Sequence, residues 1–214
     1  MTDLPLSKYL DPADYAQLTE ELVVVDRHFM TASEQHPARR WEYAMALRAL
    51  SMWRAARGAG AYSGADVGGA GSPFRRMPDL SEVVVIDPVE GDTLAEELES
   101  RTRLFHAVFC LSVLEHVEDL DQFLYHLSCL TAPGGLLFLT FDACECLTHV
   151  ATTDPHHFHW MRKRIFTLQA RTNLTATLCV EHHFRPFGEL AYQPYPGPQV
   201  YNYTFASLAL IKRS

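Results

Sequence analysis

A turn of small residues between two short apolar segments constrains the fold of this chain more than any other feature. Residues 66–72 read D-V-G-G-A-G-S, and residues 83–87 read V-V-V-I-D. A glycine-rich turn lets backbone N–H groups approach a ligand closely, and an acid that ends the next strand accepts hydrogen bonds from a ribose diol. Asp66 and Asp87 stand 87 − 66 = 21 positions apart, close to the roughly 20-residue step expected between such a turn and its ribose-binding acid. The pair predicts a site for an adenosine-containing ligand.

Two later segments extend this pattern. Residues 109–117, F-C-L-S-V-L-E-H-V, are typical of an apolar strand that runs into a loop. Residues 130–140, L-T-A-P-G-G-L-L-F-L-T, are typical of a helix end, a turn and a buried strand. In this order the three motifs resemble the class I S-adenosylmethionine-dependent methyltransferases, over roughly positions 60 to 142.

The resemblance implies S-adenosylmethionine as the cofactor and S-adenosylhomocysteine as its product. It places the methionine half of the cofactor on the glycine-rich turn, the ribose on the acid that ends the second strand, and the transferred methyl group beside the loop after residue 111. The cofactor-binding positions that it assigns are Asp66, Gly68, Gly69, Gly71, Asp87, Pro88, Leu111 and Ser112.

The turn departs from the common family form D-x-G-x-G-x-G. Ala70 and Ser72 stand where the second and third glycines would be. Because a methyl group disfavours positive φ, Gly69 and Gly71 are expected to take the strained conformations instead. Pro73 suits the first turn of a short helix, where its missing N–H has no intrahelical partner.

The hydrophobic pattern predicts an α/β fold. Strands without alternation are predicted at 63–67, 82–86, 106–111 and 136–141, and helices at 11–29, 37–57 and 119–130. Such strands, separated by helical crossovers, indicate a parallel sheet covered on both faces. The resemblance implies a three-layer α/β/α sandwich around a mostly parallel, seven-stranded Rossmann-like sheet that ends in an antiparallel hairpin strand. No third strand is recognisable between 92 and 103.

The length of 214 residues fits a single domain. We divide it into an N-terminal helical extension (1–58), a cofactor-binding core (59–142), a lid or substrate insertion (143–172) and C-terminal antiparallel strands (173–214). Within the last part, strands are expected at 175–181 and 201–212.

A histidine-rich segment follows the strand that ends near residue 141. It carries His149, Asp154, His156, His157 and His159. Because ligands bind beyond the carboxyl ends of parallel strands, this segment is expected to lie over the crevice, with His157 and His159 against the substrate. Metal binding is the alternative, but the spacing matches no standard site, so no metal is predicted.

Charge and composition limit the partners. The formal net charge of −8 and the pI near 5.7 argue against nucleic acid as a substrate. No apolar run approaches a membrane span, and the N-terminus lacks the features of a signal peptide, so a cytoplasmic protein with no membrane partner is expected. The odd count of five cysteines fits reduced thiols. A homodimer is one open possibility for the oligomeric state.

These features favour methyl transfer to a small-molecule or sugar-like acceptor. A sulfonium donor is already activated, so the protein chiefly aligns the acceptor with the methyl carbon. His116 is the candidate catalytic base, which makes O-methylation the preferred reaction; its alternative role is packing. Two other functions stay open: a non-catalytic S-adenosylmethionine-binding protein, and a nucleotide-dependent oxidoreductase. The oxidoreductase is disfavoured because Phe74 stands where the last glycine of G-x-G-x-x-G would be.

Overall fold

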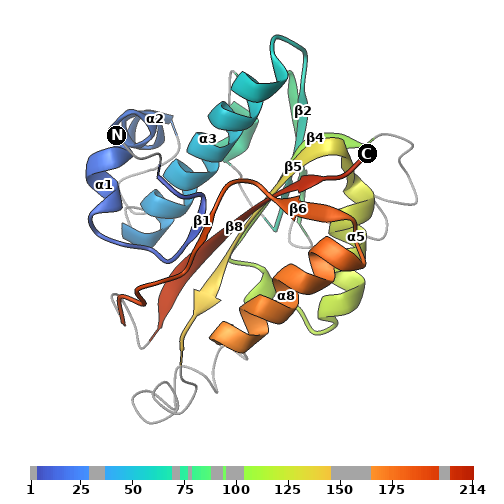
Figure 1. Ribbon diagram of the computed structural model, residues 1–214. Coiled ribbons are helices and arrows are strands. Elements are labelled where there is room, and N and C mark those ends of the chain that lie inside the picture. Colours follow the sequence, from blue (N-terminus) through green and yellow to red (C-terminus); the bar gives the residue numbers. More distant parts are fainter. Residues whose placement is uncertain are drawn as a thin grey trace.

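The strands of this chain form the middle layer of three (Figure 1). A computed structural model describes residues 4–28, 37–68, 73–76, 79–87, 94, 104–145, 165–197 and 203–214. Within these residues, α3 (Pro37–Arg57) covers one face of the sheet, and α5 (Leu120–Leu130) and α8 (Leu168–Val180) cover the other. The predicted α/β/α sandwich is confirmed.

The described part of the main sheet has six strands in the order β3-β2-β4-β5-β8-β6. Their bounds are Ser63–Val67 for β2, Glu82–Ile86 for β3, Phe105–Leu111 for β4, Thr131–Ala143 for β5, Phe184–Pro186 for β6 and Thr204–Lys212 for β8. The strands β3, β2, β4 and β5 are parallel, and β8 runs antiparallel to both β5 and β6. A mostly parallel sheet with a reversed strand was predicted. The place of a seventh strand, between β3 and β4, lies outside the described residues except for Leu94.

Both faces of the sheet are buried at β4 and β5, which explains the unbroken apolar runs at 107–111 and 136–139. Alternate side chains of β4 and β5 enter two separate cores. The core beneath α3 contains Ala107, Phe109, Leu136 and Phe138. The core beneath α5 and α8 contains Val108, Cys110, Leu137 and Leu139.

The helix predicted over 11–29 is wrong in one respect, because the structure has two helices there, α1 (Asp14–Gln17) and α2 (Thr19–His28). The carboxylate of Asp14 is buried and accepts a hydrogen bond of 2.9 Å from Trp41 Nε1 of α3. This contact holds the first turn against α3, and the chain changes direction at Leu18. The N-cap position of α1 is Ala13, whose N–H donates to Asp11 Oδ1.

The strand predicted over 175–181 is also wrong, since this segment is the second half of α8. The helix is capped by Thr167, whose side chain accepts from the backbone N–H of Ala170 at 3.1 Å. Leu174 and Leu178 are buried at helical spacing. The run of threonine, leucine, cysteine and valine favours a strand by propensity, but burial of this one face decides for a helix. The antiparallel partners of β8 are therefore β5 and the short β6.

The strand β5 is longer than the predicted 136–141, because it already begins at Thr131. Its register against β4 shifts between Phe105 and Ala107, and Gly134 has a φ of +70° at this irregularity. A second small sheet pairs β1 (Ser7–Lys8) in parallel with β7 (Leu190–Ala191). Among the residues that the structure describes, no helix is both long and apolar enough to cross a membrane.

Candidate active site

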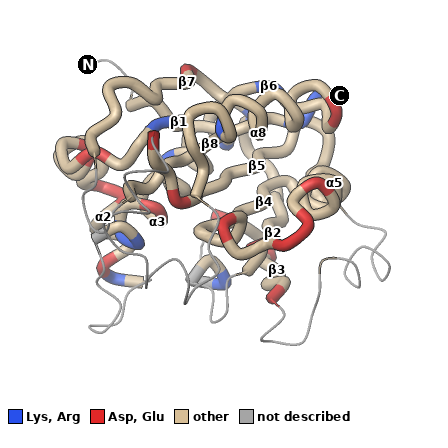
Figure 2. Tube along the Cα trace, turned by 90° about the horizontal axis from the view of Figure 1, so that it is seen from below, with Lys and Arg blue, Asp and Glu red and all other residues tan. Residues whose placement is uncertain are grey.

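The carboxyl ends of β3, β2, β4 and β5 lie along one edge of the sheet because the four strands are parallel. From β2 the chain proceeds to β3 on one side, whereas β4 lies on the other side of β2. Ligands of open α/β sheets bind at such a reversal, beyond the carboxyl ends of the strands. Figure 2 shows the chain from below, with Asp and Glu residues in red around β2, β3 and α3.

The turn after β2 requires glycine at its first position. Gly68 has a φ of +79°, and its N–H donates to the carbonyl oxygen of Ile86 at 2.8 Å. A Cβ atom on this residue would lie 2.3 Å from Cγ2 of Val113, which follows β4. The missing side chain therefore lets the turn after β2 approach the loop after β4 closely. Gly69 and Gly71, the next predicted turn positions, lie outside the described residues.

Two acids end the neighbouring strands β2 and β3. Asp66 pairs in register with Val85, and Asp87 follows β3 directly. Both side chains are buried, with 3% and 4% of their surface exposed. The structure thus brings the two acids, predicted from their spacing alone, to the same edge of the sheet. The predicted Pro88 lies outside the described residues.

A third carboxylate, which the sequence analysis missed, comes from the N-terminal extension. Glu42 of α3 is fully buried. Its Oε1 accepts hydrogen bonds from Ser112 Oγ, at 2.5 Å, and from Thr140 Oγ1. Its Oε2 accepts from Arg39 Nη1 at 3.3 Å, and the same nitrogen donates to the carbonyl oxygen of Leu111 at 3.3 Å. This network joins α3 to the ends of β4 and β5.

The sequence does hold a signal for Glu42. It lies four residues after Ala38 and three before Met45, both fully buried, so its carboxylate interrupts the apolar face of a helix. A charged residue on such a face needs buried partners. Ser112 has a φ of +52°, and this conformation after β4 accompanies its hydrogen bond to Glu42. The predicted Leu111 and Ser112 thus lie in the site together with an unpredicted partner.

The electrostatic contacts show that further acids share this edge. The carboxylate of Glu42 raises the pKa of Arg39, and Glu115 and Asp142 act in the same direction. Burial raises the pKa of the Cys110 thiol well above its usual value, and Glu115 and Asp66 add to that rise. Five acids at or near this edge are buried, namely Glu42, Asp66, Asp87, Glu115 and Asp142. Such an edge favours a ligand with positive charge.

The predicted base, His116, follows β4 at this edge of the sheet. His116 ends the short helix η2 (Leu114–His116), its side chain is exposed, and its backbone N–H donates to the carbonyl oxygen of Val113 at 2.9 Å. His157 and His159 lie outside the described residues. The described residues contain no cluster of His, Cys, Asp and Glu suited to a metal ion.

Several solved structures share the architecture of this chain. No protein-family model and no curated protein sequence matches the chain. The plantazolicin methyltransferase BpumL, solved with a triazolic desmethylPZN analogue and S-adenosylhomocysteine, superposes with a TM-score of 0.57 at 12% identity, covering 95% of this chain and 92% of that one. A 1,6-didemethyltoxoflavin-N1-methyltransferase from Burkholderia thailandensis, also with S-adenosylhomocysteine, gives 0.54 at 16% identity, covering 100% and 94%. The chain has the class I S-adenosylmethionine-dependent methyltransferase fold.

The methyltransferase fold does not by itself determine a reaction. The [4+2]-cyclase SpnF superposes with a TM-score of 0.51 at 14% identity, covering 94% of this chain and 95% of that one. The function of this chain has to be argued from its own residues at the carboxyl edge.

A buried arginine lies near the same edge of this methyltransferase fold, where α8 begins. Arg171 is 1% exposed. Its guanidinium carbon lies 4.2 Å from the ring centre of Tyr9 and 4.8 Å from that of Tyr192. The two terminal nitrogens of the guanidinium have no hydrogen-bond partner among the described residues. Burial raises the pKa of Tyr9, and the Arg171 charge opposes that rise. The charge of Arg171 is thus contacted by the faces of two tyrosine rings and by the carbonyl oxygen of Thr167, which accepts from its Nε at 3.4 Å.

Proposed function

We propose that this chain binds S-adenosylmethionine at the carboxyl ends of β2, β3 and β4 and transfers its methyl group to a small-molecule acceptor. The observation that carries the proposal is the pair of buried acids, Asp66 and Asp87, that lies beside the turn at Gly68 on the carboxyl edge. S-adenosylmethionine bears a sulfonium and an ammonium group, and both are stabilised by a negative surrounding. Structural neighbours of the same fold hold S-adenosylhomocysteine.

In this proposal the ribose and the methionine half of the cofactor each have a partner. Asp87, at the end of β3, accepts hydrogen bonds from the ribose hydroxyls, as acids at this place in nucleotide-binding folds do. The turn that begins at Gly68 holds the methionine half by its backbone N–H groups. Arg39, bonded to the carbonyl oxygen of Leu111, places a positive charge near the end of β4, where the carboxylate of the methionine half needs one.

The chemistry needs alignment more than it needs acid or base groups. A methyl group on a sulfonium is transferred in line from sulfur to the acceptor atom, so the protein has to hold acceptor and donor in one line. A hydroxyl acceptor gains from a base, and the exposed His116 beside the end of β4 supplies one. We therefore favour O-methylation of a small or sugar-like molecule. The named substrates of the neighbours BpumL and the toxoflavin enzyme are small molecules too.

The binding step is tested by titration calorimetry with S-adenosylhomocysteine. Asp87→Ala is expected to weaken binding by on the order of 1.5–3 kcal/mol, the scale of a hydrogen bond to a charged group. Asp121→Ala, which removes an exposed acid from the first turn of α5, serves as the matched control. Equal affinities for Asp87→Ala and the unaltered chain would remove Asp87 from the site.

The catalytic step is tested separately. The chain is incubated with S-adenosylmethionine and a set of hydroxyl, amine and thiol acceptors, and the release of S-adenosylhomocysteine is measured. Turnover with hydroxyl acceptors supports the proposal, and turnover with amines alone would correct the acceptor atom. Tight binding of the cofactor without any turnover would favour the non-catalytic binding protein.

A further inference from the structure

A cavity lies at the opposite edge of the sheet from the candidate active site. Gly134 stands near the start of β5, whereas Ala143 ends that strand at the carboxyl edge. Because β8 is antiparallel, Ile211 near its end pairs with Leu136 near the start of β5. The cavity between these strand ends and the end of α3 has a volume of about 440 Å³. Its described lining residues are Trp53, Ala56, Arg57, Gly134, Arg185, Phe187, Ile211, Lys212, Arg213 and Ser214.

The lining is basic although the protein is acidic. Four of the described lining residues are Arg or Lys and none is Asp or Glu, in a chain of net charge −8. All five ion pairs among the described residues use other cations, namely Lys8, Arg39, Arg40, Arg48 and Arg54. The arginines of the cavity are thus left without a carboxylate partner in the part of the chain that the structure describes.

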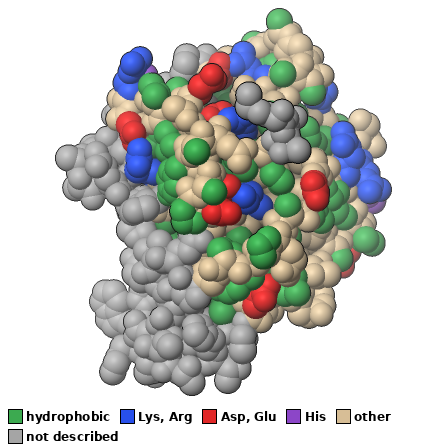
Figure 3. Space-filling model, turned by 60° about the vertical axis from the view of Figure 1, so that its left-hand side comes forward, with side chains coloured by type: hydrophobic (Ala, Val, Ile, Leu, Met, Phe, Trp, Pro, Cys, Tyr) green, Lys and Arg blue, Asp and Glu red, His purple; other side chains and the backbone are tan. Residues whose placement is uncertain are grey.

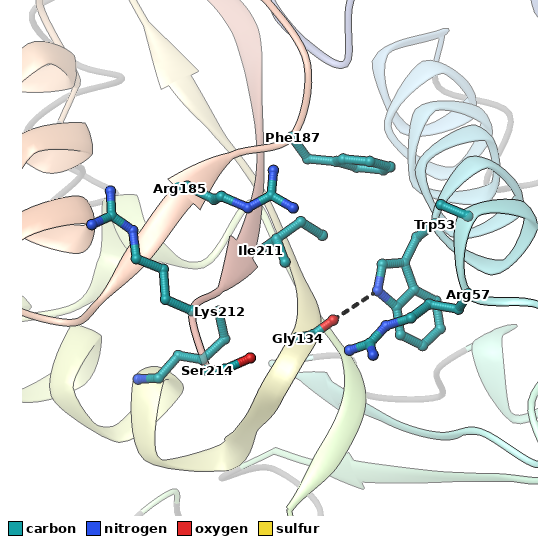
Figure 4. Close-up of a pocket in the computed structure, with 10 residues that line it drawn as sticks. Trp53, Arg57, Gly134, Arg185, Phe187, Ile211, Lys212 and Ser214 are labelled. Carbon is teal, nitrogen blue, oxygen red and sulfur yellow. Dashed lines mark hydrogen bonds between the residues drawn. The ribbon is translucent and has the colours of Figure 1, made fainter.

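The four cations that line the cavity are not equally suited to bind an anion. The ammonium group of Lys212 donates to the carbonyl oxygen of His182 at 2.8 Å and to the hydroxyl of Ser128, so its hydrogen bonds are used there. Arg57 and Arg185 come from α3 and β6. Figure 4 shows them on different sides of the cavity, with the rings of Trp53 and Phe187 along the wall between them. These two guanidinium groups are the anion-binding candidates.

The place of Arg57 depends on a glycine. A Cβ atom on Gly134 would lie 1.8 Å from Arg57 Nη2. The bare turn therefore lets the guanidinium lie over it, where Nη2 donates to the carbonyl oxygen of Pro133 at 3.3 Å. Trp53 also holds this turn, because its Nε1 donates to the carbonyl oxygen of Gly134 at 3.0 Å. One guanidinium is thereby fixed at the cavity by backbone contacts.

We propose that this cavity binds a small phosphate-bearing molecule, with its phosphate between Arg57 and Arg185. A guanidinium offers a planar set of donors that matches phosphate oxygens and stays charged at every physiological pH. Phe187 and Ile211 give the carbon part of the ligand an apolar wall. The volume lies within the range of small-molecule sites. This site is separate from methyl transfer and does not depend on the function proposed above.

The test uses pyrophosphate as the probe and titration calorimetry as the measurement. Saturable binding with one site per chain is expected, and Arg57→Gln and Arg185→Gln should each weaken it by on the order of tenfold or more, the scale of a charge-assisted hydrogen bond. Arg27→Gln removes the same charge from the exposed surface of α2 and should leave the affinity unchanged. An equal loss in all three variants would reduce the effect to net charge and overturn the proposal, as would the absence of saturable binding.

A second measurement avoids the variants altogether. Phenylglyoxal modifies accessible guanidinium groups, and mass spectrometry locates the modified arginines. Pyrophosphate should protect Arg57 and Arg185 but not Arg27. Uniform modification with and without pyrophosphate would overturn the site.

A third measurement tests whether the two sites are separate. Titration of S-adenosylhomocysteine into Arg57→Gln and Arg185→Gln should give wild-type affinity, because these residues lie at the other edge of the sheet. A loss of that affinity in both variants would contradict two separate sites.

Discussion

The hydroxyl of Ser112 donates a hydrogen bond of 2.5 Å to the carboxylate of Glu42, 70 residues earlier in the chain. This contact ties the N-terminal helix α3 to the residue that follows β4. It makes the N-terminal extension a structural part of the candidate active site, where the sequence analysis expected only the core from 59 onward.

Removing the Glu42 carboxylate should cost stability. Glu42→Ala leaves the hydroxyls of Ser112 and Thr140 and the guanidinium of Arg39 without their common acceptor. Because buried polar groups that lose a partner cost roughly 1–3 kcal/mol each, and because Arg39 is partly exposed, we expect a loss of about 2–4 kcal/mol in the free energy of unfolding. Urea denaturation measures it. Glu20→Ala, an exposed acid in the first turn of α2, should change the value by less than about 0.5 kcal/mol.

Glu42→Gln distinguishes charge from hydrogen bonding. The amide oxygen still accepts a hydrogen bond from Ser112, so this variant should retain more stability than Glu42→Ala. If cofactor affinity falls in Glu42→Gln while stability is retained, the negative charge itself acts on the ligand. A Glu42→Ala variant as stable as the unaltered chain would contradict the structural role.

Alanine at Gly68 should impair the site through two separate costs. Its φ of +79° is strained for any side chain, and the new Cβ meets Val113. Gly188 has a φ of +89° and open space around its Cβ position, so Gly188→Ala carries the backbone strain alone, about 1 kcal/mol. We expect Gly68→Ala to lose more stability than Gly188→Ala in thermal unfolding and to lose S-adenosylhomocysteine affinity as well. Equal effects of the two variants would show that the contact with Val113 is easily relaxed.

His116→Ala should lower kcat by about 10²–10⁴-fold on a hydroxyl acceptor, the typical contribution of a general base. The affinity for S-adenosylhomocysteine should change little, because the base acts on the acceptor. Single-turnover rates compare this variant with His157→Ala and His159→Ala, the other candidates from the sequence. His28→Ala, on the exposed end of α2, is the control. A wild-type rate for His116→Ala would leave this residue a packing role.

Arg171 should be replaceable by a neutral side chain of similar length. Its charge is buried, and its terminal nitrogens have no hydrogen-bond partner among the described residues. Replacing such a buried charge by a well-packed apolar side chain is often neutral or stabilising. We expect Arg171→Met to stay within about 1 kcal/mol of the unaltered stability or to exceed it, whereas Arg171→Ala should lose about 2–4 kcal/mol because it leaves a cavity. A large loss in Arg171→Met would show that the tyrosine faces stabilise the charge more than its burial costs.

The sequence predicted the elements whose signals are local. The strands 63–67 and 82–86 and the helix 37–57 have the bounds that the structure shows. Their signals are the glycine turn after residue 67, the run V-V-V-I at 83–86 and the helical periodicity of 37–57, and none of these depends on distant residues. Gly58 follows α3 with a φ of +86°, the left-handed conformation in which glycine commonly ends a helix. Asp66 and Asp87 were found in the same way, from a spacing within one β-turn-β unit.

Long-range contacts determined the elements that the sequence did not predict correctly. The threonine-rich segment 175–181 is helical because burial of Leu174 and Leu178 outweighs its strand propensity, and the helix at the N-terminus divides because Asp14 bonds to Trp41 of α3. Neither the core that buries Leu174 and Leu178 nor the hydrogen bond between Asp14 and Trp41 can be predicted from the neighbouring residues in the chain.

By itself, then, the sequence determined a parallel α/β sheet with a glycine turn at Gly68 and an acid at the end of the next strand, because short segments of the chain carry these signals. Only the tertiary structure decided that Glu42 meets Ser112 at the candidate active edge and that Arg57 and Arg185 line one cavity at the other. A side chain's partners across 70 or more residues depend on how whole elements pack, and the free energy of that packing is a sum over many contacts that no short segment contains.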